Sequence, residues 1–239
     1  MNHNQHPPRP LVPPPFPAAP GTPSWSPHQR AKTGKQKRAT GMRFAAGYLI
    51  VIWSVFLINI FYFGGLLVYL GIHPLDTAWL PGLFFAPLLH GDINHIVSNS
   101  LPGAIFCFLI GYSGARVFWE VTAIVGVVGG AGTWIFGGVG TNHIGASGLV
   151  YGWLTYLIVR GVFNRSFRQV LLGLILGFFY SSLIWGVLPL TPGVSWQAHL
   201  FGAIGGILAG MVISSDDPPV LVAKRQRRRA ERAPMRYYN

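Results

Sequence analysis

The stretch GASGLVYG at residues 145–152 sets Gly148 and Gly152 four residues apart at the head of an apolar segment. A second stretch, AHLFGAIGG at 198–206, repeats that spacing. Small residues four apart let two helices approach closely in lipid. We therefore predict that the helices containing these two stretches pack directly against each other. Gly71 lies outside both pairs, and we expect a larger side chain to matter much less there.

Six apolar segments can be recognised along the chain. Of its 239 residues 51% are hydrophobic and only 10% are charged, a composition that excludes a disordered protein and argues against a soluble enzyme. A spanning helix needs about 20 mostly apolar residues. The sequence thus predicts an all-α membrane protein whose domain, 44–213, is a six-transmembrane-helix bundle with helices near 44–71, 93–112, 117–136, 147–161, 169–188 and 198–213.

The positive charges lie on one side of this arrangement. The net charge of +12 would by itself indicate nucleic acid, but seven Lys and Arg residues lie at 9–43 and seven at 224–236. Only Arg116, Arg160, Arg165 and Arg168 lie between these two groups. The loops at 72–92, 137–146 and 189–197 contain none. By the positive-inside rule, both termini are expected to be cytoplasmic in a multi-pass protein of the cell membrane, with the lipid bilayer and not nucleic acid as partner.

Two terminal tails flank the expected bundle. Residues 1–43 are polar and basic and hold ten of the 19 prolines, so we expect a disordered cytoplasmic tail and not a cleavable signal peptide. Residues 214–239 form a second basic cytoplasmic tail. The single cysteine, Cys107, lies in an apolar run and excludes both a disulfide and a cysteine-based metal site.

A few polar residues interrupt the apolar segments, and polar groups at membrane depth indicate a functional site by default. At about 1.5 Å per helical residue, Ser147, His199 and Asn99 each lie about 20 Å from the cytoplasmic side, at one level in the outer half of the bilayer. His95 lies four residues before Asn99, so both are expected on one helix face. His90 has the same spacing to Asn94; these two precede the apolar run and are expected at the outer rim in a structural role.

The polar residues at one level favour serine-based chemistry. Taken alone, Ser147 could be a helix cap and His199 a packed polar group, but together they favour a nucleophile and its general base. Other intramembrane chemistries lack their residues: the sequence contains no His-Glu-x-x-His motif, no lysine between Lys37 and Lys224, and no acidic pair in its central helices. We expect neither a metal nor a cofactor.

Three motifs together resemble the rhomboid family of intramembrane serine proteases, and most closely its six-helix bacterial form. They are Gly145-Ala146-Ser147-Gly148, then Ala198-His199 followed by Gly202 and Gly206, and the set His90, His95 and Asn99. The resemblance implies that Ser147 is the nucleophile and His199 the base. It further implies an oxyanion hole formed by His95, Asn99 and the Ser147 N–H, with Tyr151 beneath the histidine ring.

The resemblance also implies a place in the bacterial inner membrane. The substrates that it implies are single-pass membrane proteins, cleaved within their transmembrane segments. One departure from the family lies in the first outer loop, where Trp79 is followed by leucine and not by the family's frequent arginine. The alternatives are a catalytically inactive rhomboid-like protein that binds transmembrane helices, and a transporter-like bundle. Inactive relatives usually lose the serine or the histidine, and transporters commonly show internal repeats, which are absent here.

Overall fold

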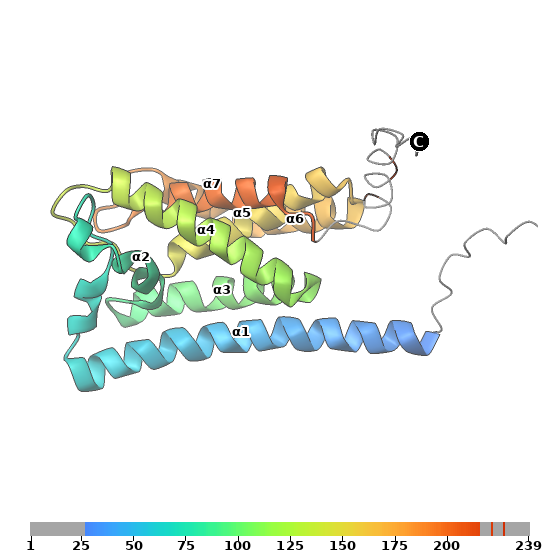
Figure 1. Cartoon of the computed structure of the whole chain (residues 1–239), viewed down its shortest axis with the longest axis horizontal. Coiled ribbons are helices and arrows are strands. Elements are labelled where there is room, and N and C mark those ends of the chain that lie inside the picture. Colours follow the sequence, from blue (N-terminus) through green and yellow to red (C-terminus); the bar gives the residue numbers. More distant parts are fainter. Residues whose placement is uncertain (1–26, 216–220, 222–226, 228–239) are drawn as a thin grey trace, which may run out of the picture.

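The computed structural model describes residues 27–215 together with 221 and 227, and every regular element within them is helical. Figure 1 shows the arrangement, with α1 lying along the outside of the bundle beside α3. The long helices are α1 Pro27–Phe63, α3 Ile93–Ser113, α4 Ala115–Phe136, α5 Ser147–Asn164, α6 Phe167–Phe179 and α7 Trp196–Val212. The short ones are α2 Gly82–Phe85 and the 3-10 helices η1 Leu66–Leu70, η2 Thr77–Trp79, η3 Ala86–Leu88 and η4 Ser181–Val187.

The six predicted segments all contain a long helix, with η4 continuing α6 after a bend of 69°. Within the described part of the chain, three helices are long and apolar enough to cross a membrane, namely Gly34–Phe63 within α1, α3 and α4. The pair α6 and η4 counts as a fourth if it forms one bent span, while α7 is a shorter apolar helix. The all-helical bundle is therefore as predicted, and six membrane crossings stay a prediction.

The first helix differs from the prediction at both ends. It begins at Pro27, so residues 27–43 are helical, although we expected them to be disordered. The ten N-terminal prolines end at Pro27, and proline is well tolerated at a first helical position, so composition averaged over 1–43 hid this boundary. The helix stops at Phe63 because Gly64 and Gly65 take positive φ angles of 56° and 87°. Residues 1–26 and most of the expected C-terminal tail lie outside the described residues.

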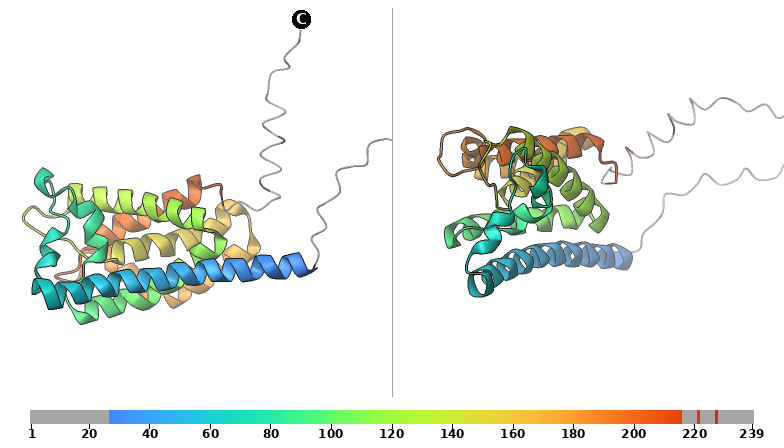
Figure 2. Two further views of the ribbon diagram at one scale, coloured as in Figure 1. Left: turned by 60° about the horizontal axis from the view of Figure 1, so that its bottom comes forward. Right: turned by 60° about the vertical axis from the view of Figure 1, so that its left-hand side comes forward.

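The predicted contact between the two glycine-rich stretches is confirmed. A β-carbon added to Gly202 of α7 would collide with the carbonyl oxygen of Gly148 on α5, and one added to Gly206 would collide with that of Gly152. A hydrogen bond from Thr155 Oγ1 to the carbonyl of Ala203 (2.8 Å) joins the same helices. Figure 2 shows α5 and α7 side by side toward one face of the bundle. Backbone-to-backbone approach thus fixes the separation of α5 and α7.

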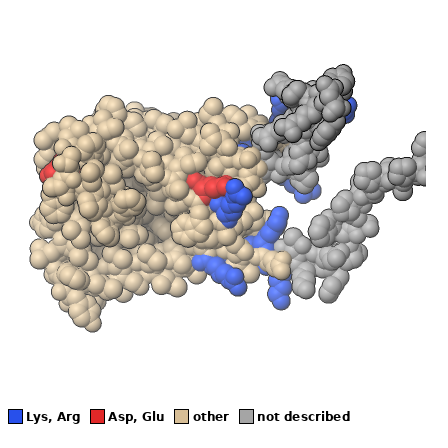
Figure 3. Space-filling view, viewed as in Figure 1, with Lys and Arg blue, Asp and Glu red and all other residues tan. Residues whose placement is uncertain are grey.

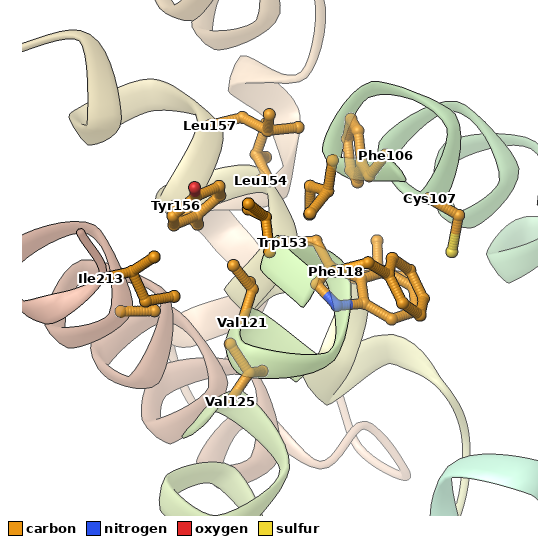
Figure 4. Close-up of a cluster of buried hydrophobic side chains, with 14 of the residues drawn as sticks. Phe106, Cys107, Phe118, Val121, Val125, Trp153, Leu154, Tyr156, Leu157 and Ile213 are labelled. Carbon is orange, nitrogen blue, oxygen red and sulfur yellow. The ribbon is translucent and has the colours of Figure 1, made fainter. Parts of the chain in front are cut away.

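A cluster of buried side chains from α3, α4, α5 and α7 forms the core (Figure 4). Trp153 lies at its centre, almost fully buried, and its indole N–H donates to Thr122 Oγ1 (3.1 Å). Cys107 is fully buried there, as expected of a lone cysteine in an apolar run. At one edge, the buried guanidinium of Arg160 donates to the carbonyl of Gly210 (3.0 Å), which joins the far ends of α5 and α7.

The connection between α1 and α3 is held by backbone contacts and not by an arginine after Trp79. Ile72 and His143 exchange two backbone hydrogen bonds of 2.9 Å, and Leu75 N–H donates to the carbonyl of Trp134 (3.0 Å). Gly71 is therefore not a tolerant position: a β-carbon there would lie 2.6 Å from the carbonyl oxygen of His143. The expectation for Gly71 was wrong because the chain turns inward after α1 instead of ending a spanning helix there.

Charged side chains are sparse on the described surface. Figure 3 shows the Lys and Arg residues of this face gathered toward one end of the bundle, away from the loops at the other end. One ion pair there, between Arg116 Nε and Glu120 Oε1 (2.7 Å), joins residues one turn apart on α4. The one-ended distribution of positive charge fits the expectation that the basic junctions share a side.

Gly202→Val should destabilise the fold, because the new side chain meets backbone of α5 that cannot move aside. Overpacking of this kind costs about 3 kcal/mol or more. Gly47→Val is the matched control: it makes the same change in a helix, α1, where a β-carbon would meet nothing within 4 Å. Thermal unfolding of the detergent-solubilised variants measures the difference. Equal losses for the two would mean that α5 and α7 do not depend on this approach.

Candidate active site

Ser147 is the first residue of α5 and follows a turn that only glycine suits at Gly145. The φ of Gly145 is +112°, and a β-carbon there would collide with the ring of His95. The Gly145 N–H donates to the carbonyl of Ala86 (2.9 Å), which ties the turn to η3. The first N–H groups of a helix have no partner within it, and the helix dipole is positive at this end. Ser147 therefore presents a hydroxyl beside N–H groups suited to a negatively charged oxygen.

His199 of α7 lies next to this serine. Its Nε2 is 2.8 Å from Ser147 Oγ, and its Nδ1 is 2.8 Å from the carbonyl oxygen of Gly186 in η4. Because a carbonyl only accepts, we assign the ring proton to Nδ1, which leaves Nε2 free to accept from the serine hydroxyl. This is the tautomer in which a histidine can remove a proton from serine.

Tyr151 supports the histidine ring from below. It lies one turn after Ser147 on α5, and its ring stacks on that of His199 with centroids 4.1 Å apart and planes 7° apart. A β-carbon on Gly186 would collide with the Tyr151 hydroxyl, so η4 can approach only with glycine at that position. The imidazole is thus held by a ring on one side and a backbone carbonyl at its edge.

His95 and Asn99 face the serine from α3. Asp92 caps this helix by accepting from the His95 N–H (2.9 Å), and the His95 ring lies against Gly145. One N–H of the Asn99 amide donates to the carbonyl of His95 (2.9 Å), and Asn99 is only 4% exposed. The structure brings these two residues together with Ser147 and His199 around one cavity.

The cavity above these four residues is large, about 1290 Å³. Its walls include Gly138, residues 141–144 and residues 189–197, none of which is Lys or Arg. This volume can admit water and an extended piece of polypeptide to the Ser147 hydroxyl. Within the described residues no group of three or more metal-ligating side chains is found.

His90 does not lie at the rim, contrary to our expectation, whereas Asn94 is exposed there and lines the cavity. His90 is 1% exposed and lies under the serine turn, where its Nε2 accepts weakly from the Ala146 N–H (3.5 Å). Its ring also packs edge-on to His95 with centroids 5.0 Å apart. The connection before α3 folds inward here, which spacing along the sequence could not show.

Gly186 is the site residue that the sequence analysis missed. Its contribution is a backbone carbonyl, for which no side-chain type or spacing gives a signal. The bend between α6 and η4, which aims that carbonyl at His199, also lies inside a segment that reads as one continuous apolar run.

The sequence of this chain is similar to those of several known proteins. Residues 77–216 match the family model of the Rhomboid domain. An uncharacterised protein of Mycobacterium tuberculosis is 41% identical over 163 residues, which are 65% of this chain and 68% of that protein. An uncharacterised protein of Mycobacterium leprae is 41% identical over 155 residues, 62% of this chain and 61% of its own length. YdcA of Bacillus subtilis, named provisionally as a rhomboid protease, is 31% identical over 131 residues, 51% of this chain and 61% of its own.

His90 should make the stability of the fold depend on pH. Burial, and then the neighbouring ring of His95, lowers the pKa of His90 to about 4, below its ordinary value of 6.5. The unfolded chain therefore binds a proton first: the full stability is present above pH 6.5 and is lost as the pH falls toward 4. The loss is roughly 3 kcal/mol over that window.

His90→Gln keeps an acceptor for the Ala146 N–H but does not titrate, so its stability should fall less between pH 6.5 and 4. Unfolding temperatures of the two proteins across this range give the difference. Burial and the nearby His73 also lower the pKa of His143. Because His143 is present in both proteins, its contribution cancels in the difference between them. Parallel pH profiles for the two proteins would exclude His90 as the source.

Proposed function

The chain belongs to the rhomboid family, and we propose that it is an intramembrane serine protease that cleaves the transmembrane segments of membrane proteins. The observation that carries the proposal is the 2.8 Å contact between Ser147 Oγ and His199 Nε2. It lies at the floor of a cavity large enough for both water and a peptide. Several long apolar helices and the family indicate a multi-pass membrane protein acting on membrane substrates.

In the proposed reaction His199 Nε2 takes the hydroxyl proton of Ser147 as Oγ attacks a peptide carbonyl of the substrate. The resulting oxyanion is stabilised by the Ser147 N–H and by donors of His95 and Asn99. Collapse of this intermediate breaks the peptide bond, and the histidine returns the proton to the leaving amine. Water from the cavity, activated by the same histidine, then hydrolyses the acyl-enzyme.

Gly186 takes the place that a carboxylate holds in a three-residue system. Its carbonyl accepts from His199 Nδ1 (2.8 Å) and favours the tautomer that can act as a base. A neutral carbonyl stabilises the imidazolium less than a carboxylate does, but it also costs less to bury in a membrane. Tyr151 limits the ring to one plane.

The substrates we propose are single-pass membrane proteins. A peptide carbonyl inside a helix is hidden by its own hydrogen bond, so the substrate must unwind locally to reach Ser147. The mouth of the cavity is lined by loops free of positive charge, and we propose that these face the outside of the cell while both termini are cytoplasmic.

Ser147→Ala tests the function directly and should abolish proteolysis while the chain still inserts and folds. Purified wild-type protein in detergent should cleave a single-pass model substrate and react with a fluorophosphonate probe, with the label on Ser147 by mass spectrometry. Neither reaction should occur with the variant. Wild-type protein that does neither, yet binds the model substrate, would indicate instead an inactive helix-binding protein.

Asn99→Ala should slow turnover by about 10²-fold without abolishing it, because one of several oxyanion donors is lost. The rate at saturating substrate is the quantity to compare. Asn164→Ala is the matched control, since it removes a buried amide at the other end of α5, far from Ser147. A variant at Asn99 that loses stability but keeps the wild-type rate would remove this residue from the oxyanion hole.

A further inference from the structure

A second serine–histidine pair lies beside the first, with the roles of the two chain segments exchanged. His143 Nδ1 is 2.6 Å from Ser195 Oγ, and His199 Nε2 is 2.8 Å from Ser147 Oγ. Each pair is separated by 52 residues along the chain. His143 precedes the serine of the active site by four residues, and Ser195 precedes its histidine by four. Residues 143–147 and 195–199 therefore lie side by side in parallel, with His143 opposite Ser195 and Ser147 opposite His199.

His143 is the fixed end of this second pair. Its backbone exchanges two hydrogen bonds of 2.9 Å with Ile72, and its Nε2 lies 2.8 Å from Thr141 Oγ1. The Thr141 hydroxyl donates to the carbonyl of Gly138 (2.5 Å), so it accepts from Nε2–H of His143. Nδ1 is then unprotonated and accepts from the Ser195 hydroxyl. The imidazole is 8% exposed and is held on every polar atom.

Ser195 is the other end of this pair. It is the N-cap residue of α7, a position where serine usually accepts from an N–H of the first turn, but its side chain makes no such cap. Its hydroxyl is directed to His143 instead. Its own carbonyl accepts from the His199 N–H (3.2 Å), so its position is passed to the histidine through one turn of backbone. Ser195 also ends the loop 189–195 along the cavity.

We propose that the hydrogen bond from Ser195 to His143 is a brace that sets the position of His199 relative to Ser147. His143 and Ser195 are accordingly positioning residues, which act on the reacting atoms through His199. The glycines of α5 and α7 fix how far apart these helices lie, whereas the brace fixes how far one is shifted along the other. This inference rests on the proposed function for its effect on rate, but not for its effect on the His199 ring.

Ser195→Ala removes the brace while leaving the backbone and the cavity wall in place. We expect Ser147 to react with the fluorophosphonate about tenfold more slowly, since displacements of less than 1 Å already lower rates at such sites. His143→Leu should have the same effect, and the double variant should be no slower than either single one, because both remove one contact. His143→Asn puts an amide near the position of Nδ1 and should restore most of the rate.

Ser100→Ala is the matched control. Ser100 accepts from the Trp53 indole N–H (3.0 Å), so this variant also loses a serine contact with an aromatic ring, but between α1 and α3. It should lower the unfolding temperature and leave the labelling rate unchanged. Equal slowing by Ser100→Ala, additive slowing by Ser195→Ala and His143→Leu, or failure of His143→Asn to restore the rate would overturn the brace.

A second readout does not depend on activity. The ¹⁵N resonance of His199 Nε2, assigned with His199→Gln, reports the hydrogen bond to Ser147 in the intact chain. It should shift in Ser195→Ala and His143→Leu but not in Ser100→Ala.

If wild-type protein is not labelled and the resonance shifts, the brace stands and the protease function fails. If Ser147 is labelled at the wild-type rate in Ser195→Ala and the resonance is unmoved, the function stands and the brace fails. A label on Ser195 would overturn the assigned roles of both pairs.

Discussion

The approach of Gly202 to the Gly148 carbonyl is the constraint on which the rest of the site depends. Lipid gives apolar side chains little reason to prefer one another to acyl chains, so helices in a membrane are held by close packing and by hydrogen bonds. Two helices whose backbones are in contact have a defined separation, and a larger side chain between them would prevent that contact. Ser147 and His199 lie near the N-terminal ends of these helices. The separation of the two backbones therefore also sets the distance between these two side chains.

Around that contact, polar groups are satisfied from within the protein, as burial in an apolar medium requires. Helix termini, backbone carbonyls and hydroxyls supply the partners: Gly186 for His199, the carbonyl of His95 for Asn99, and that of Gly210 for Arg160. The first of these bonds joins α7 to η4, the second lies within α3, and the third joins α5 to α7. The apolar core around Trp153 occupies the space between the two ends of the bundle.

Much of this could be predicted from the sequence, for identifiable reasons. Apolar segment length located the six long helices, and glycine spacing predicted the packing of α5 on α7, because both properties are local to one segment. Counting helical rise placed Ser147, His199 and Asn99 at one level. The burial of His90, the tight surroundings of Gly71 and the carbonyl of Gly186 could not be foreseen, since each depends on how a segment between two long helices folds back. The start of α1 at Pro27 was missed because a composition averaged over 43 residues conceals a boundary within them.

The bend of 69° between α6 and η4 makes the orientation of His199 depend on a segment outside the core. The group that orients His199 belongs to η4, a 3-10 helix of which no residue is buried. Any displacement of η4 removes the acceptor from Nδ1 and lets the imidazole exchange its proton between the two nitrogens. The orientation of the histidine in the proposed active site therefore depends on the position of a segment that lies at the surface of the bundle.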